Sequence, residues 1–215
     1  MVAAGLGRRF GGPKQFLELA GRPVVAWSVD AARSVADGVV LVVPGVGSGP
    51  RDGATGDSAM GADRVVHGGA TRAESVRAGL AAVPEDVEII VVHDAARPLA
   101  SPALFAAVVD AVRSEECDGA VPVLPVADTL KRTSGGRVLT TVEREGLAMT
   151  QTPQAFVAST LRRAHDTGAD ATDDAGLLER LGAAVATVAG DTRNLKVTRP
   201  EDMQLAEALM ESTAR

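Results

Sequence analysis

The chain has 215 residues, enough for one domain with a well-buried hydrophobic core. Its net charge of −6 and aromatic content of 2% argue against a nucleic-acid partner, which needs a positive surface and stacking side chains. Cys117 is the only cysteine, which excludes an internal disulfide and favours a reducing compartment. The sequence contains neither a signal peptide nor a run of about 18 apolar residues, so we expect a cytoplasmic protein without a membrane partner.

Short β-branched runs alternate with alanine-rich helical patterns along the chain. This alternation predicts an α/β, Rossmann-like fold over residues 1–215, in which helices flank a mostly parallel sheet. The predicted strands are 1–4, 38–43, 64–67, 87–93, 119–123, 184–188 and a segment near 195–198. The predicted helices are 23–35, 72–82, 102–115, 158–167, 173–181 and a last helix that begins at Pro200. Residues 45–62 are rich in Gly, Ser and Asp and indicate a surface loop.

Residues 129–144 break this alternation. Two β-rich runs flank Ser134, Gly135 and Gly136, a pattern that predicts a β-hairpin with a glycine turn. A lone two-stranded hairpin is marginally stable in water, so we expect this arm, residues 126–146, to pack against a second subunit. The alternative is an edge hairpin that folds back on its own sheet.

The first residues after the predicted opening strand form a glycine-rich turn. Gly5 and Gly7 lack side chains that would keep phosphate oxygens from the backbone N–H groups. Arg9 and Lys14 follow closely and add positive charge suited to a triphosphate. Phe10 stands where the dinucleotide fingerprint has its third glycine, so the glycine pattern alone is weak.

Lysine is rare in this chain, because only Lys14, Lys131 and Lys196 are found among 22 basic residues. Lysine carries a compact ammonium and arginine a planar guanidinium, so neither can replace the other at a specific site. Each lysine is therefore a candidate functional residue.

Asp94 follows the most apolar predicted strand, at the edge of a parallel sheet where ligands bind. A carboxylate at this edge can hold Mg²⁺ against phosphate oxygens, because Mg²⁺ favours one or two carboxylates with phosphates and water. The alternative is a cap on the following turn. We expect the preceding His93 to point to the other face without a catalytic role.

A further strand-to-helix junction contains Gly69, Thr71 and Glu74. Thr71 and Glu74 have the spacing of a capping box, which accounts for both without a ligand. Downstream, Thr172 precedes two acidic residues and fits a helix N-cap equally well as a binding role.

Taken in order, these segments resemble the 2-C-methyl-D-erythritol 4-phosphate cytidylyltransferases of the non-mevalonate isoprenoid pathway. The matching segments are 3–15, 68–75, 93–98, 128–131, 144–147, 152–156, 171–174 and 194–202. The resemblance runs from about Ala3 to Leu209 and includes all three lysines. Only two residues precede Ala3, where members of the family usually carry a longer first strand, so we expect either a weakened central sheet or a true start that lies further upstream.

The resemblance implies transfer of a cytidylyl group from CTP to 2-C-methyl-D-erythritol 4-phosphate, with release of pyrophosphate, in a Mg²⁺-dependent homodimer. It implies catalytic roles for Arg9, Lys14, Arg144 and Lys196, and metal binding by Asp94. It implies a nucleotide pocket formed by Ala3, Ala4, Gly5, Gly7, Gly69, Arg72 and Ser75. It implies acceptor binding by Arg97, Thr129, Thr152 and Thr172.

Four alternatives remain open at the level of sequence. The first is a cytidylyltransferase for another polyol phosphate such as ribitol 5-phosphate, and the second is a guanylyl- or uridylyltransferase of the same fold. The third is a dehydrogenase built around Gly5 and Gly7, which needs an acidic ribose anchor about 20 residues further on, where only Asp30 lies near. The fourth is a nucleotide sensor without catalytic activity.

Overall fold

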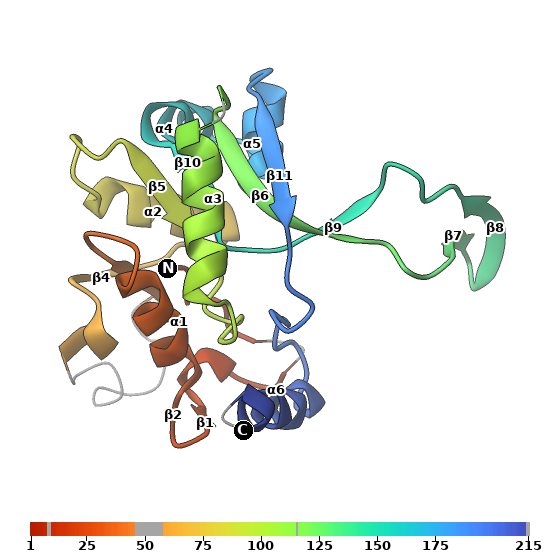
Figure 1. The fold of residues 1–215 in the computed structure, drawn as a ribbon, viewed down its shortest axis with the longest axis horizontal. Coiled ribbons are helices and arrows are strands. Elements are labelled where there is room, and N and C mark those ends of the chain that lie inside the picture. Colours follow the sequence, from red (N-terminus) through yellow and green to blue (C-terminus); the bar gives the residue numbers. More distant parts are fainter. Residues whose placement is uncertain (8–9, 46–57, 115, 214–215) are drawn as a thin grey trace.

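The computed structural model describes residues 1–7, 10–45, 58–114 and 116–213 of the chain, and Figure 1 gives an overview. Its helices are α1 Val24–Arg33, α2 Arg72–Ala82, α3 Pro102–Ser114, α4 Ala158–Asp166, α5 Ala175–Arg180 and α6 Glu201–Thr213, with 3-10 turns η1 Lys14–Phe16 and η2 Ser58–Gly61. Its strands are β1 Glu18–Leu19, β2 Arg22–Pro23, β3 Val40–Val43, β4 Arg64–His67, β5 Ile89–Val92, β6 Gly119–Pro125, β7 Leu130–Ser134, β8 Arg137–Val142, β9 Ala148–Thr150, β10 Gln154–Val157 and β11 Val185–Ala189.

The central sheet has the strand order β11-β6-β10-β5, and β9 also pairs with β6. β11 runs parallel to β6, whereas β10 runs antiparallel to both of its neighbours. β3 and β4 form a parallel pair, and Val2 joins this pair to β5 through parallel bridges to Val42 and Asp94. The predicted α/β fold with a mostly parallel sheet is therefore confirmed.

Helices cover both faces of the sheet. α3 packs on β5, β6, β10 and β11 and contacts α1, whereas α2, α4 and α5 pack on the opposite side. Phe156, Leu161 and Leu178 lie at the centre of the core under α2, α4 and α5, and Val29 and Phe105 lie in the core under α1 and α3. Among the described helices, none is both long enough and apolar enough to cross a membrane.

The predicted first strand, 1–4, is reduced to a short bridge. The amide of Val2 donates to the carbonyl of His93 and that of Ala3 to the carbonyl of Val42, both at 2.8 Å. Behind this bridge, aliphatic side chains from α1, α2, α3, β3 and β5 line a cavity of about 470 Å³, and the Met1 amino group donates to Val40. Val2 thus links β3 to the end of β5 at their carboxyl ends, where the site lies.

The sequence predicted most elements, and the bounds of β4 and α2 match it residue for residue. The predicted strand near 195–198 is wrong, because this extended segment joins no sheet and is held by a bond from the Val197 amide to the Ala96 carbonyl, 2.8 Å long. β10 was missed. It follows Pro153, and its insertion between β5 and β6 depends on contacts with distant parts of the chain.

Strands β7 and β8 form the predicted hairpin, with Leu130 paired to Val142. Gly135 and Gly136 have φ of 54° and 75°, the left-handed region that the tight turn needs. The hairpin is a separate two-stranded sheet that projects from the body on two extended connections (Figure 1). The apolar side chains of Val138 and Leu139 are exposed on it.

Candidate functional site

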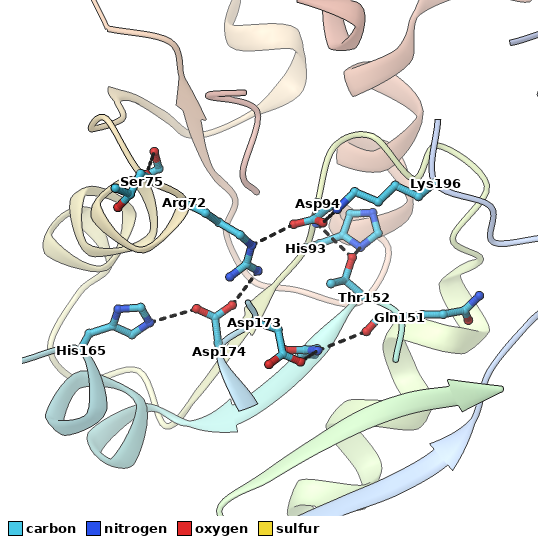
Figure 2. Close-up of polar contacts among 12 residues, drawn as sticks. Arg72, Ser75, His93, Asp94, Gln151, Thr152, His165, Asp173, Asp174 and Lys196 are labelled. Carbon is cyan, nitrogen blue, oxygen red and sulfur yellow. Dashed lines mark hydrogen bonds and ion pairs between the residues drawn. The ribbon is translucent and has the colours of Figure 1, made fainter. Parts of the chain in front are cut away.

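Five charged or titratable side chains form a continuous series of contacts at the carboxyl end of β5, which we call the ionic chain (Figure 2). Lys196 Nζ donates to Asp94 Oδ2 at 2.6 Å, and Arg72 Nε donates to Asp94 Oδ1 at 3.4 Å. Arg72 also donates from its Nη2 to Asp174 Oδ2 at 2.7 Å. His165 Nε2 lies 3.0 Å from Asp174 Oδ1 and ends the series. The sheet edge thus brings together residues from five separate segments.

The charges of the ionic chain balance one another. Burial disfavours the Asp94 carboxylate, but the charges of Lys196 and Arg72 outweigh burial and hold the pKa of Asp94 below its usual range. The pKa of Asp174 is also lowered, because hydrogen bonds from His165 and Arg72 outweigh its burial. Both carboxylates are therefore ionised at neutral pH, and their cationic partners are groups that can bind phosphate.

His93 and Thr152 hold Asp94 in place from beneath. The Asp94 amide donates to the Thr152 hydroxyl oxygen, which lies 3.1 Å from His93 Nδ1, and His93 Nε2 lies 3.2 Å from the Arg97 carbonyl. We assign the proton to Nε2, because the carbonyl can only accept. Burial lowers the pKa of His93 to about 3, so the ring is neutral and structural at neutral pH.

A buried asparagine anchors the segment that carries Lys196. Asn194 Nδ2 donates to the carbonyl of Thr152 at 2.9 Å, and the Asn194 carbonyl accepts from Arg97 at 2.7 Å and from Gln151 at 3.2 Å. These bonds dock the C-terminal segment on the loops that follow β5 and precede β10. The predicted site residues Arg97, Thr152 and Lys196 therefore belong to one hydrogen-bonded assembly.

Gln15 fixes the glycine-rich loop at the same edge of the sheet. Its buried amide donates from Nε2 to the carbonyls of Ala3 at 2.5 Å and Gly5 at 2.9 Å. Lys14, the residue before it, begins η1 and is partly buried. Arg9, the other cation predicted for this loop, lies outside the described residues.

Gly5 and Gly7 differ in whether the fold leaves space for a side chain. Gly7 has φ of 61°, and a Cβ there would come within 1.7 Å of the Gly12 carbonyl oxygen, so the fold itself excludes a side chain. At Gly5 a Cβ would meet no atom of the described residues within 4 Å. The open space beside Gly5 leaves room for a ligand close to the backbone.

The predicted capping box at the start of α2 is confirmed. The Thr71 side chain accepts from the Glu74 amide at 3.1 Å, and the Glu74 carboxylate accepts from the Thr71 amide. A Cβ at Gly69 would lie 2.4 Å from the Glu74 Cβ, and the buried Ser75 hydroxyl donates to the Thr71 carbonyl at 2.9 Å. Local packing therefore accounts for Gly69 and Ser75, and their contact with cytidine stays a prediction.

Thr172 is exposed and lines an open groove of about 780 Å³ beside Arg72 and Arg180. The prediction that Thr172 caps the helix after it is wrong. The helix begins two residues later than a Thr172 cap requires, and the Asp173 carboxylate accepts from the Gly176 amide at 3.1 Å. The Thr172 hydroxyl is thus not used as a cap.

Thr129 and Arg144 flank the projecting hairpin rather than the ionic chain. The Arg144 guanidinium donates to the backbone carbonyls of Val126 and Ala127 at the base of the arm. The arm projects away from the end of β5 within one chain (Figure 1). The contribution of Thr129 and Arg144 to a site shared with a second subunit stays a prediction.

The sequence analysis missed Asp174 and His165, the buried end of the ionic chain. It assigned no functional role to His165 or to Asp174, and the structure shows both buried and bonded to each other. The signal for Asp174 was its place in the Thr172 motif. His165 lies on α4 and offered no signal, since its meeting with Asp174 depends on how α4 and α5 pack.

The donor set fits one magnesium ion bound together with a triphosphate. The Asp94 side chain is 13% exposed and ionised at the ligand edge of the sheet. The described part of the chain contains no group of three or more His, Cys, Asp or Glu residues able to hold a metal. Since Mg²⁺ is commonly held by one or two carboxylates with phosphates and water, Asp94 suffices only when a phosphate ligand completes the shell.

Comparison with known proteins places these residues in a family. The family model for IspD, 2-C-methyl-D-erythritol 4-phosphate cytidylyltransferase, matches residues 1–212. The chain is 45% identical to the enzyme of that name from Nocardia farcinica, and the match covers 99% of this chain and 93% of the relative. It is 41% identical to the enzyme from Rubrobacter xylanophilus, and that match covers 100% of this chain and 95% of the relative. It also matches 56% of a bifunctional IspD/IspF enzyme from Nitratidesulfovibrio vulgaris, over 97% of this chain and with 44% identity.

Solved structures show the same likeness. The crystal structure of 2-C-methyl-D-erythritol 4-phosphate cytidylyltransferase from Thermus thermophilus is 39% identical and superposes with a TM-score of 0.81, covering 98% of this chain and 96% of that one. The 4-diphosphocytidyl-2C-methyl-D-erythritol synthase from Anaerococcus prevotii gives the same TM-score at 28% identity, over 98% and 95%.

Proposed function

This chain belongs to the 2-C-methyl-D-erythritol 4-phosphate cytidylyltransferase family, and we propose from that premise how its residues share the work of the reaction. It transfers the cytidylyl group of CTP to 2-C-methyl-D-erythritol 4-phosphate in isoprenoid precursor synthesis. The products are 4-diphosphocytidyl-2-C-methyl-D-erythritol and pyrophosphate. The observation that carries our assignment of roles is the ion pair of Lys196 with Asp94 at the carboxyl end of β5.

The chemistry is an in-line displacement at phosphorus. A phosphate oxygen of the acceptor attacks the α-phosphorus of CTP, the new P–O bond forms, and the bond to the leaving pyrophosphate breaks. Such a step needs positioning and neutralisation of charge rather than a covalent intermediate on the protein. We assign Lys196 to the attacking phosphate, which it reaches by leaving the Asp94 carboxylate.

The glycine-rich loop supplies the site for the triphosphate. Arg9 and Lys14 neutralise the charge that grows on the leaving pyrophosphate. Backbone groups of the first loop and the start of α2 form the cytidine pocket, and the open space at Gly5 supports this placement. This pocket comprises Ala3, Ala4, Gly5, Gly7, Gly69, Arg72 and Ser75.

Asp94 would hold Mg²⁺ together with the triphosphate, and the ion would supply further neutralisation of phosphate charge. When Lys196 moves to the substrate phosphate, the Asp94 oxygen that faces it loses the ammonium and becomes available as a ligand.

The acceptor binds where two chains meet. Arg97, Thr152 and Thr172 of one chain face Thr129 and Arg144 of a second chain, whose hairpin reaches across. The projecting shape of the hairpin and the exposed Val138 and Leu139 support a homodimer built through this arm.

One incubation tests the acceptor and the reaction class. The protein is mixed with CTP, Mg²⁺ and 2-C-methyl-D-erythritol 4-phosphate, and the product mass is measured. Parallel reactions use ribitol 5-phosphate as acceptor, or UTP or GTP as donor. We expect the highest kcat/KM for CTP with the methylerythritol acceptor. A higher kcat/KM for ribitol 5-phosphate would contradict the assigned acceptor.

The expected cytoplasmic location has its own test, which is fractionation of cells.

A further inference from the structure

Asp94 has two cationic partners that differ in their freedom to move. Lys196 on one side is 41% exposed and extends from a surface segment. Arg72 on the other side also contacts Asp174, whose side chain is only 1% exposed. One partner of Asp94 thus lies at the boundary with solvent, and the other is tied to a buried anion.

Both carboxylate oxygens of Asp174 are occupied. Oδ2 accepts from Arg72 at 2.7 Å, and Oδ1 faces His165 Nε2 at 3.0 Å (Figure 2). Asp174 stands directly before α5, and His165 lies on α4, which packs against α5. A buried carboxylate that lost either donor would carry an unsatisfied charge, so Asp174 cannot turn away at low cost.

The guanidinium geometry allows Arg72 to hold two anions at once. Its planar group has five donors, so Nη2 can remain on Asp174 while Nε stays on Asp94. The ammonium of Lys196 lies on a flexible four-carbon stem, and its bond to Asp94 is at the solvent boundary.

We propose that Asp174, backed by His165, is a positioning residue that keeps Arg72 on Asp94 while Lys196 leaves that carboxylate for the substrate phosphates. This inference rests on the function proposed above. Arg72 is then the fixed counter-charge of Asp94 and Lys196 is the exchangeable one. Without the buried Asp174 carboxylate, an arriving triphosphate would draw both Arg72 and Lys196 away from Asp94.

A double-mutant cycle tests this arrangement. The variants are Asp174→Asn, Arg72→Met and the two combined, with kcat and the KM of each substrate measured for all. We expect Asp174→Asn to lower kcat about tenfold or more, as is usual for groups that orient site residues, with a smaller change in the KM for CTP. Because Asp174 acts through Arg72, the double variant should match Arg72→Met alone.

Asp118→Asn is the matched control. The Asp118 carboxylate also has two partners, the Thr160 hydroxyl at 2.9 Å and the Ala184 amide at 3.0 Å, but it lies beside the amino end of β6. This variant should lower the urea midpoint of unfolding and leave kcat unchanged. It separates loss of stability from loss of positioning.

Losses that multiply in the double variant would overturn the proposal, because Asp174 would then act independently of Arg72. Wild-type kcat in Asp174→Asn would overturn it as well. Wild-type kcat in Arg72→Met would overturn it too, because Arg72 would then not be needed as the counter-charge of Asp94. A raised KM for CTP with unchanged kcat in that variant would leave only the pocket role of Arg72 under the proposed function. If Asp174→Asn fails to fold, His165→Leu replaces it, and its smaller loss of kcat should vanish in the Arg72→Met background.

Discussion

The ammonium of Lys196 lies 2.6 Å from Asp94 Oδ2, although 102 residues separate the two in the chain. The pair connects the segment before α6 with the end of β5, the strand at the heart of the site. Because Lys196 is 41% exposed, the bond is open to solvent and opens at low cost when a stronger anion approaches. The ion pair therefore keeps a cation beside the proposed phosphate site.

Replacing Lys196 with glutamine should slow chemistry more than it weakens CTP binding. We expect Lys196→Gln to lower kcat on the order of 10²–10³, because a charged donor to the transition state is lost. Steady-state kinetics with both substrates measure the effect. Arg199→Gln, an exposed basic residue three positions later, is the matched control and should keep wild-type kcat. Near-wild-type turnover in Lys196→Gln would contradict the role.

Lys14→Ala tests the cation assigned to the leaving pyrophosphate. We expect a large fall in kcat and a small change in the dissociation constant of CTP, since the interaction strengthens only as charge develops. Turnover assays and isothermal titration with CTP measure the two quantities. If the variant shows only a roughly twofold rise in KM, the transition-state role of Lys14 is refuted.

Mixed subunits test whether the hairpin completes the site of another chain. Arg144→Ala and Lys196→Ala are each expected to be nearly inactive. Random pairing of the two should restore roughly a quarter of wild-type activity, because half the dimers are mixed and each has one intact site. The control is each variant taken through the same subunit exchange alone. No gain over the single variants would argue against a shared site.

His93 should make the fold sensitive to mild acid. Its pKa falls from 6.5 to about 3 on folding because the neutral ring is buried, so the unfolded chain binds more protons between these values. Stability contributed by His93 is full above about pH 6.5 and is lost as pH falls, by up to about 1.4 kcal/mol per pH unit. The lowered carboxylate pKa values act mainly below about pH 4, since their usual value is 3.8, and so contribute little between about pH 6.5 and about pH 4.5.

Urea unfolding at about pH 6.5 and about pH 4.5 measures this dependence. His93→Gln keeps a polar side chain but does not titrate, so its free energy of unfolding should change less between the two pH values. An equal change in the variant and the wild type would show that another group is responsible.

Local signals explain what the sequence predicted well. The Thr71 and Glu74 spacing fixes the start of α2 through bonds within one turn, so the predicted bounds match. The Gly135 and Gly136 turn likewise specifies the hairpin from adjacent residues. Asp94 was placed correctly because a carboxylate after an apolar strand is itself a local pattern.

What the sequence did not predict depends on contacts between distant segments. β10 pairs antiparallel with β5 on one side and with β6 on the other. The sequence of its four residues contains no pattern that predicts this position. The bond between His165 and Asp174 depends on how α4 and α5 pack, and the docking of Asn194 depends on the loop before β10. Such relationships arise only in the assembled fold.

The separation of 102 residues between Asp94 and Lys196 means that the two halves of the pair leave the ribosome at different times. β5, and Asp94 after it, emerge about a hundred residues before the lysine that pairs with Asp94. A nascent polypeptide halted before this point lacks the ammonium entirely, whatever secondary structure it has acquired. Termination anywhere between Asp94 and Lys196 therefore yields molecules without a complete charge pair.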